Sequence, residues 1–161
     1  MSVQEAEPKE PPGEEQVYSV AAGLLGVKGK KARPKSRLEI HEFLLSGLSG
    51  KAVTSLRRHC HILVLEETVE PALGMSLRTV QRFEADQDKH LSSEQSSRAW
   101  KFAEIVARAT TVFGSQDAAE KWLSEPARAF EGKKPIELLA TQPGTQLVED
   151  LLQQIDYGVY V

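Results

Sequence analysis

The sequence lacks the paired cysteines, the long apolar runs and the signal peptide that are typical of secreted and membrane proteins. It holds a single cysteine, Cys60, which excludes a disulfide within the chain and fits a reducing compartment. It has no apolar run approaching the ~20 residues that cross a bilayer. Its first residues are acidic and rich in proline, unlike a signal peptide. We therefore expect a cytoplasmic protein that makes no membrane contact.

The motifs of the common enzyme classes are also missing. The sequence contains no glycine-rich phosphate loop, no GxSxG and no cysteine with an evident basic partner. His59, Cys60 and His61 are adjacent, but neighbouring residues on one helix point in different directions. His41 and His90 lie too far away in sequence to complete a metal-ligand motif. We predict that the protein is not an enzyme and has no catalytic residue, metal or cofactor.

The first 37 residues differ in composition from the rest. Residues 1–16 contain three prolines and no apolar periodicity. Residues 17–26 form a short apolar patch that ends in glycine, and this patch can form a helical turn that docks on the body or on a second copy. The segment VKGKKARPKSR then carries six cations and no acidic residue. We expect residues 1–37 to be a disordered arm, first acidic and then basic. Lys30, Lys31 and Arg33 are predicted to contact DNA phosphates nonspecifically, although a solvated linker explains the charge equally well.

Residues 38–90 have the pattern of a helix-turn-helix region. Amphipathic helices are predicted over residues 38–48 and 51–64, and Leu73-Gly74-Met75 resembles the turn before a second helix at residues 76–83. Met75, Val80 and Phe83 are predicted to pack inward. The face toward the DNA major groove is predicted to consist of Ser76, Leu77, Arg78, Gln81 and Arg82.

Pro71 is the feature of this region that does not fit a helix-turn-helix. Proline inside a helix removes a hydrogen bond and collides with the preceding turn. Two alternatives follow for the first helix of the motif. Either it begins late, with Pro71 in its first turn, or it is kinked.

The stretch from Leu91 to Tyr157 predicts four well-punctuated helices. Ser92 or Ser93 can cap a long first helix that Gly114 ends, and Ser115 or Asp117 can cap a second that Pro126 closes. A short third helix begins near Pro135, and a last one ends at Gly158 with an apolar stripe of Leu147, Val148, Leu151, Leu152 and Ile155. Thr141 to Thr145 are predicted to be a tight connection. Gly114, Trp122 and Pro143 are assigned to structure.

These residues also carry a family resemblance. LSSEQSSRAWKFAEIVARATTVFG, the WL of Trp122-Leu123 and GKKPIELLATQPGTQLVEDLLQQIDYG resemble the toxin-binding domain of Xre/MbcA/ParS-type antitoxins. The resemblance implies an all-α protein with three parts. These are the arm at 1–37, an Xre-like helix-turn-helix DNA-binding region at 38–90, and a four-helix toxin-binding half with a C-terminal tail at 91–161.

The same resemblance implies a function. Antitoxins of this type accompany RES-class toxins, or related ADP-ribosyltransferase-like toxins, that attack or use NAD. We therefore expect the chain to cover the active site of such a toxin, and to repress its own operon by binding operator DNA as a homodimer within a larger complex. The wide apolar surface of residues 98–113 indicates either burial between the two halves or a dimer contact.

The residues predicted to bind toxin lie at two places in the last third of the chain. From Ala129 onward acidic residues outnumber basic ones, which suits a cationic NAD pocket. Tyrosines near the C-terminus suit an interface anchor, although the alternative is that Tyr157 packs on its own helix and the tail frays. The predicted toxin contacts are Lys133, Lys134, Pro135, Asp156, Tyr157, Tyr160 and Val161.

Two other functions are compatible with the sequence. One is a dimeric helix-turn-helix transcriptional regulator with no toxin partner, which rests on residues 76–82 and the basic segment. The other is a helical adaptor for some other protein, which has the same composition.

Overall fold

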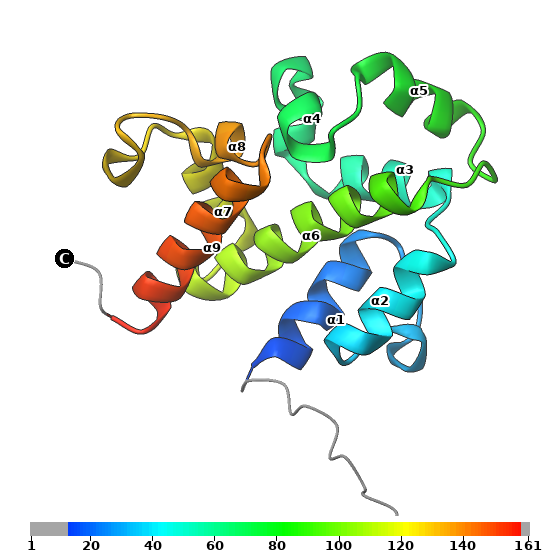
Figure 1. The fold of residues 1–161 in the computed structure, drawn as a ribbon, viewed down its shortest axis with the longest axis horizontal. Helices are drawn as coiled ribbons and strands as arrows, with labels where there is room; N and C mark the ends of the chain where they lie inside the picture. The colour runs from blue at the N-terminus through cyan, green and yellow to red at the C-terminus, as the bar shows by residue number, and fades with distance from the viewer. Residues whose placement is uncertain (1–12, 159–161) are drawn as a thin grey trace, which may run out of the picture.

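The long helix α6, Ser93–Phe113, is the element around which the others pack (Figure 1). Ser92 caps it through a capping box: the Ser92 hydroxyl accepts from Gln95 N at 3.1 Å, and the Gln95 side chain accepts from Ser92 N at 3.0 Å. Gly114 ends it in the left-handed conformation, at φ 90°. Both predicted ends of this helix are therefore confirmed.

The computed structural model describes residues 13–158, which contain helices and one isolated bridge between Ser49 and His90. The all-α prediction is confirmed over this range. None of the described helices is long and apolar enough to cross a membrane. In order along the chain the elements are α1 Glu14–Leu24, η1 Lys30–Ala32, α2 Arg37–Leu45, α3 Gly50–His59, η2 His61–Val64, α4 Glu66–Leu73, α5 Leu77–Ala85, α6 Ser93–Phe113, α7 Gln116–Ser124, η3 Arg128–Phe130, α8 Pro135–Leu138 and α9 Gln142–Asp156.

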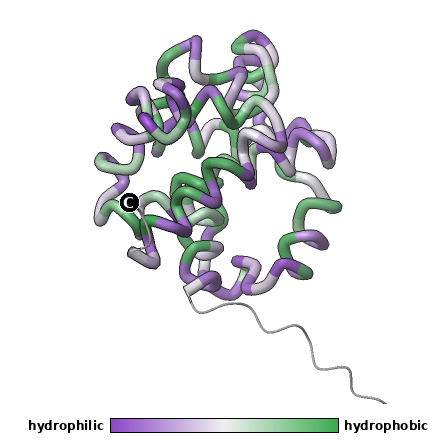
Figure 2. Tube along the Cα trace, turned by 60° about the vertical axis from the view of Figure 1, so that its left-hand side comes forward, coloured by the Kyte–Doolittle hydropathy of each residue, from purple (hydrophilic) through white to green (hydrophobic). Residues whose placement is uncertain are grey.

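The core is one continuous cluster to which nearly every helix contributes. Helices α1, α2 and α4 pack against α6 from one half of the chain, and α7 and α9 pack against it from the other. Figure 2 shows hydrophobic and hydrophilic residues alternating along the helices, as amphipathic helices around a shared core require. Trp100, Phe102, Ile105 and Val106 are all buried. Burial between the two halves therefore accounts for the wide apolar surface of α6.

The predicted disordered arm is wrong for the described part of residues 1–37. Residues 14–24 form α1, whose Val17, Tyr18 and Ala21 are buried against the rest of the core. The apolar patch is a longer helix than the sequence indicated, because Glu14 and Glu15 belong to its first turn, where carboxylates are favourable. The basic segment that follows runs through η1 into α2. Residues 1–12 lie outside the described residues.

The predicted helix over residues 51–64 is interrupted. Helix α3 ends at His59, Cys60 is extended at φ −111° and ψ 103°, and η2 follows. Side chains from α7 hold this break: Glu120 Oε1 accepts from Ile62 N at 2.7 Å, and Gln116 Nε2 donates to His59 O at 2.6 Å. Tertiary partners thus replace the helical hydrogen bonds that the sequence pattern predicted.

The two motif helices form where the sequence predicts them, but Pro71 lies inside α4. The alternative in which α4 begins late, with Pro71 in its first turn, is therefore wrong. Gly74 takes the left-handed conformation at φ 66° and links α4 to α5. The turn favours glycine for its backbone, because a side chain at a positive φ is strained.

The four helices predicted over residues 91–157 are present as α6, α7, α8 and α9, with η3 in addition. One boundary needs correction, because residues 142–144 begin α9 and are not a connection. Thr141 caps this helix by accepting from Gly144 N at 3.1 Å, and Pro143 lies in its first turn. Leu147 also differs from its prediction: its side chain is 52% exposed, outside the buried stripe.

Candidate functional site

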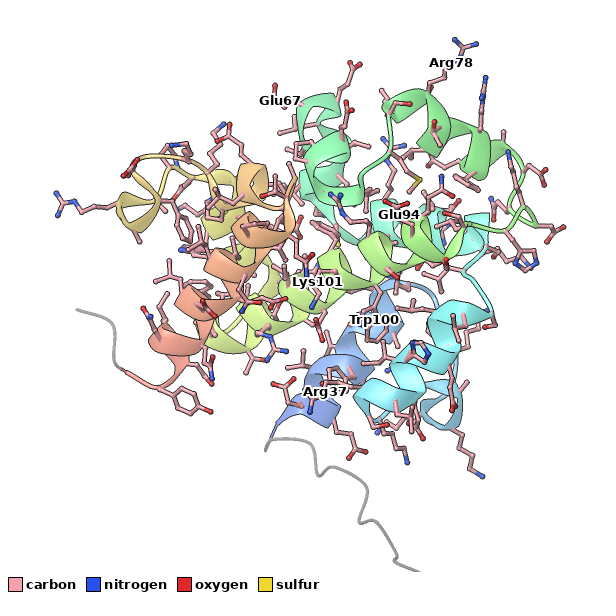
Figure 3. All side chains as sticks on the ribbon, in the orientation of Figure 1. Arg37, Glu67, Arg78, Glu94, Trp100 and Lys101 are labelled. Carbon is pink, nitrogen blue, oxygen red and sulfur yellow. The ribbon has the colours of Figure 1, made fainter. Side chains whose placement is uncertain are left out.

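The predicted DNA-binding residues share one outward face of α5. Ser76 caps the helix by accepting from Thr79 N at 3.2 Å. Met75, Val80 and Phe83 are buried as predicted, while Ser76, Arg78, Gln81 and Arg82 are exposed and Leu77 is half-buried. Figure 3 shows Arg78 extending away from the molecule. The face therefore presents two guanidinium groups and one amide to solvent, groups that can pair with base edges.

The three cations predicted for phosphate contact have different environments. Lys30 and Lys31 are exposed in η1. Arg33 turns back toward α1: its Nη1 donates to Ser19 Oγ at 3.1 Å and its Nε to Val27 O at 3.3 Å. These bonds fix the basic segment on the body of the protein, which makes Arg33 a structural residue and leaves Lys30 and Lys31 as the exposed charges of the three.

The first group of predicted toxin contacts lies in the loop between η3 and α8. Lys133 is exposed, with its Nζ 4.0 Å from a Glu131 carboxylate oxygen. Lys134 is half-buried, and its backbone N–H donates to Glu137 Oε2 at 3.1 Å, which caps α8. Pro135 is buried as the first residue of that short helix. Lys133 is thus the member of this group best placed to meet a partner.

The second group lies at the end of α9. Asp156 and Tyr157 are exposed, and the Tyr157 side chain is 69% exposed. The alternative that Tyr157 packs on its own helix is therefore wrong. Tyr160 and Val161 lie outside the described residues. Leu147 on α9 and Tyr157 directly after α9 are both large and exposed, which makes Leu147 a contact candidate that the sequence pattern missed.

A polar cleft of about 420 Å³ separates the end of α9 from α1, and Asp156 and Tyr157 lie on its lining. A chain of ion pairs crosses it. Arg108 binds Glu14 through both guanidinium nitrogens, at 2.5 and 2.8 Å, and Lys101 Nζ lies 2.9 Å from Glu104 and 2.8 Å from Glu149. The hydrogen bonds from Arg108 hold the pKa of the Glu14 carboxyl below its ordinary value.

Part of the acidic excess after residue 129 is neutralised within the chain. Glu131 pairs with Lys133, Glu137 caps α8 and Glu149 pairs with Lys101. Asp150 and Asp156 remain exposed on α9. Glu131 and Glu137 stay exposed in spite of these contacts, so the half-buried Glu149 is the acid among these three that is withdrawn from the surface offered to a partner.

In the His59-Cys60-His61 cluster, Cys60 packs in the core and the two histidines face solvent. Cys60 is fully buried, whereas both histidines are exposed. Burial, reinforced by the charge of Glu120, raises the pKa of the Cys60 thiol to about 12, so the thiol stays protonated at neutral pH. Among the described residues, no three histidine, cysteine or acidic side chains gather as a metal site would require.

Comparison with known proteins gives a family match in the C-terminal third. Residues 108–158 match the family described as the antitoxin Xre/MbcA/ParS C-terminal toxin-binding domain. Over 124 residues the chain is 35% identical to an Antitoxin Xre from Pseudomonas putida, covering 76% of this chain and 74% of the relative. It is 30% identical to a Prs ADP-ribosylating antitoxin from a Sphingobium species, covering 69% of this chain and 76% of the relative. An Antitoxin Xre from Yersinia enterocolitica is 29% identical, covering 71% and 76%.

Proposed function

Because the chain belongs to the Xre/MbcA/ParS family of antitoxins, we propose that it neutralises a RES-class toxin by covering the toxin's NAD-binding active site. The observation that carries this proposal is the exposed end of α9, where Asp156 and Tyr157 project beside each other within the matched toxin-binding domain. A pocket that holds the pyrophosphate of NAD is cationic or rich in hydrogen-bond donors, so an acidic and aromatic helix end is complementary to it.

The name of the Sphingobium relative supports a second candidate target. That relative is called a Prs ADP-ribosylating antitoxin. An ADP-ribosyltransferase-like toxin also holds NAD in a donor-rich pocket, and the same surface of α9 suits it. The two targets are separated by the reaction that the antitoxin suppresses, which is NAD hydrolysis in one case and ADP-ribose transfer to a protein in the other.

Co-expression tests the toxin proposal. We would purify a tagged form of this chain together with the protein encoded beside it, and follow NAD loss by that partner with and without the chain. The expected result is a stable complex in which NAD consumption stops. Removing Val159 to Val161 is expected to weaken the complex, and unchanged affinity would reject a role for the tail while leaving the domain assignment intact.

We also propose that the protein represses its own operon through α5. The exposed Arg78, Gln81 and Arg82 supply base-reading groups, and Lys30 and Lys31 supply phosphate contacts. Arg78→Ala is expected to reduce specific operator binding about 10-fold or more, because a bidentate base contact contributes ~1–3 kcal/mol of discrimination. If the protein bound its promoter but retained no partner, the alternative of a transcriptional regulator without a toxin would lead.

Reading two half-sites requires a two-fold dimer. The apolar surface of α6 is occupied within the chain, but α2 carries Leu38 and Leu45 on one outer face, 57% and 65% exposed. We assign the dimer contact to this face of α2. Leu45→Asp is expected to give a monomer in size-exclusion chromatography with light scattering, whereas Val64→Asp, at an equally exposed position of 65%, serves as the control.

A further inference from the structure

A second hollow lies on the other side of α9 from the polar cleft. This α7–α9 groove has a volume of about 350 Å³ and is lined by Phe113, Trp122, Ala127, Ala129, Leu151 and Ile155, with Arg128 beside them. Every one of these residues falls within 108–158, the segment that matches the toxin-binding family. An apolar hollow of this kind on a helix surface is a feature of binding sites, because exposed apolar area is otherwise unfavourable.

The walls of the groove are preformed. The rings of Phe113 and Trp122 pack with their centroids 5.2 Å apart, which fixes the wall formed by α6 and α7. The loop wall is closed by backbone hydrogen bonds: Ala127 N donates to Lys133 O at 3.0 Å, and Gly132 N donates to Ala127 O at 3.0 Å. Phe130 anchors the same loop in the core. A side chain entering the groove therefore orders little of the protein, which favours tight binding.

The groove lies between the two groups of residues that the sequence predicted to contact the toxin. Its loop wall is held by the carbonyl of Lys133, and its α9 wall ends at Ile155, the residue before Asp156 and Tyr157. Arg128 is exposed and supplies a positive charge beside an otherwise apolar lining. A residue that fits this environment has an apolar side chain and an acidic neighbour.

We propose that the α7–α9 groove is an anchor pocket for the toxin. It receives an aromatic or branched aliphatic side chain from the toxin surface, and Arg128 pairs with a carboxylate next to that side chain. This inference rests on the proposed toxin-binding function and adds to it a second contact, separate from the end of α9. In this arrangement the groove supplies affinity, while Asp156 and Tyr157 reach the active site.

Filling the groove tests the proposal without removing any core contact. Ala129 is exposed on the groove wall, so Ala129→Trp places a ring in the space that the toxin side chain would occupy. Ala32→Trp, at an exposed position in η1, is the matched control. We would measure the Kd of each variant for the toxin by calorimetry, after confirming by circular dichroism that both unfold at the same temperature as the wild type.

The expected result is that Ala129→Trp weakens toxin binding by at least ~10-fold, as loss of a buried anchor does, while Ala32→Trp leaves the Kd unchanged. Arg128→Glu is expected to weaken binding in the same direction. If the wild type binds toxin and Ala129→Trp has an unchanged Kd, the groove is not an anchor pocket, while the proposed toxin-binding function is unaffected. The same holds if Ala129→Trp alters only the oligomeric state of the free protein, since a second copy is then the occupant. A wild type that binds no toxin would overturn both.

Discussion

At the scale of single residues, burial changes the chemistry of the Cys60 thiol. Its pKa of about 12 predicts that the native thiol reacts negligibly with a thiol reagent at mildly alkaline pH and reacts fully once urea unfolds the chain. A free thiol has an ordinary pKa of 9.0, so the unfolded state loses its proton first as pH rises. The native state therefore loses stability between about pH 9 and pH 12. Rapid labelling of the folded protein would contradict this burial.

Glu120 is one of the two α7 residues that bond to the break after α3. Replacing it with alanine removes the acceptor 2.7 Å from Ile62 N and leaves that buried N–H without its partner. We expect Glu120→Ala to lower the free energy of unfolding by ~1–3 kcal/mol, measured by urea denaturation.

Glu125→Ala is the control for Glu120→Ala. Glu125 is 58% exposed and lies 4.0 Å from Lys121, so its removal is expected to change stability by less than ~0.5 kcal/mol. Equal effects of the two substitutions would show that the buried hydrogen bond contributes nothing beyond an ordinary surface charge.

At the scale of elements, two leucines of α9 that the sequence places in one apolar stripe differ in burial. Leu147 is 52% exposed, whereas Leu152 is fully buried. Leu152→Ala is therefore expected to lower the free energy of unfolding by ~2–5 kcal/mol. Leu147→Ala should change it by less than ~0.5 kcal/mol. Thermal and urea unfolding check both values. A comparable loss of unfolding free energy for Leu147→Ala would show that the Leu147 side chain is part of the core.

The same comparison shows why periodicity alone misassigned Leu147. The two leucines both satisfy an apolar pattern, but a stripe read from sequence has no fixed edge. Which residue lies outside it depends on where α6 and α8 contact α9.

At the scale of the whole molecule, the ion pair between Glu14 and Arg108 connects α1 to α6, although the two residues are 94 positions apart in sequence. Arg108 lowers the pKa of Glu14, so this pair stabilises the fold above the ordinary pKa of 4.5 and the contribution is lost as pH falls through the lowered value. Glu14→Gln is expected to lower the unfolding temperature at neutral pH. The difference from wild type should shrink below pH 4.5.

Glu15→Gln provides a neighbouring control for Glu14→Gln. Glu15 is exposed in the same first turn of α1, so its substitution should leave the unfolding temperature near that of the wild type at every pH. If both variants behaved alike, docking of α1 would not depend on Arg108. The measurement therefore tests directly that residues 14–24 belong to the folded body.

The helix ends of this protein could be predicted from the sequence because caps and glycine turns act over only one or two helical turns. Ser92, Gly114 and Ser115 fix helix ends through their own backbone and side-chain preferences, and those ends form where predicted. Gly74 and Ser76 likewise fix the turn and start of α5.

The long-range features were decided only by the tertiary structure. The break at Cys60 is held by Glu120 and Gln116, which are distant in sequence, and α1 is bonded to Arg108, which is 94 residues away from Glu14. The α7–α9 groove exists because Phe113, Trp122 and Ile155 come from three helices. Periodicity and capping determine which segments are helical, whereas the exposed faces and the spaces between helices depend on how those segments pack, which no local pattern encodes.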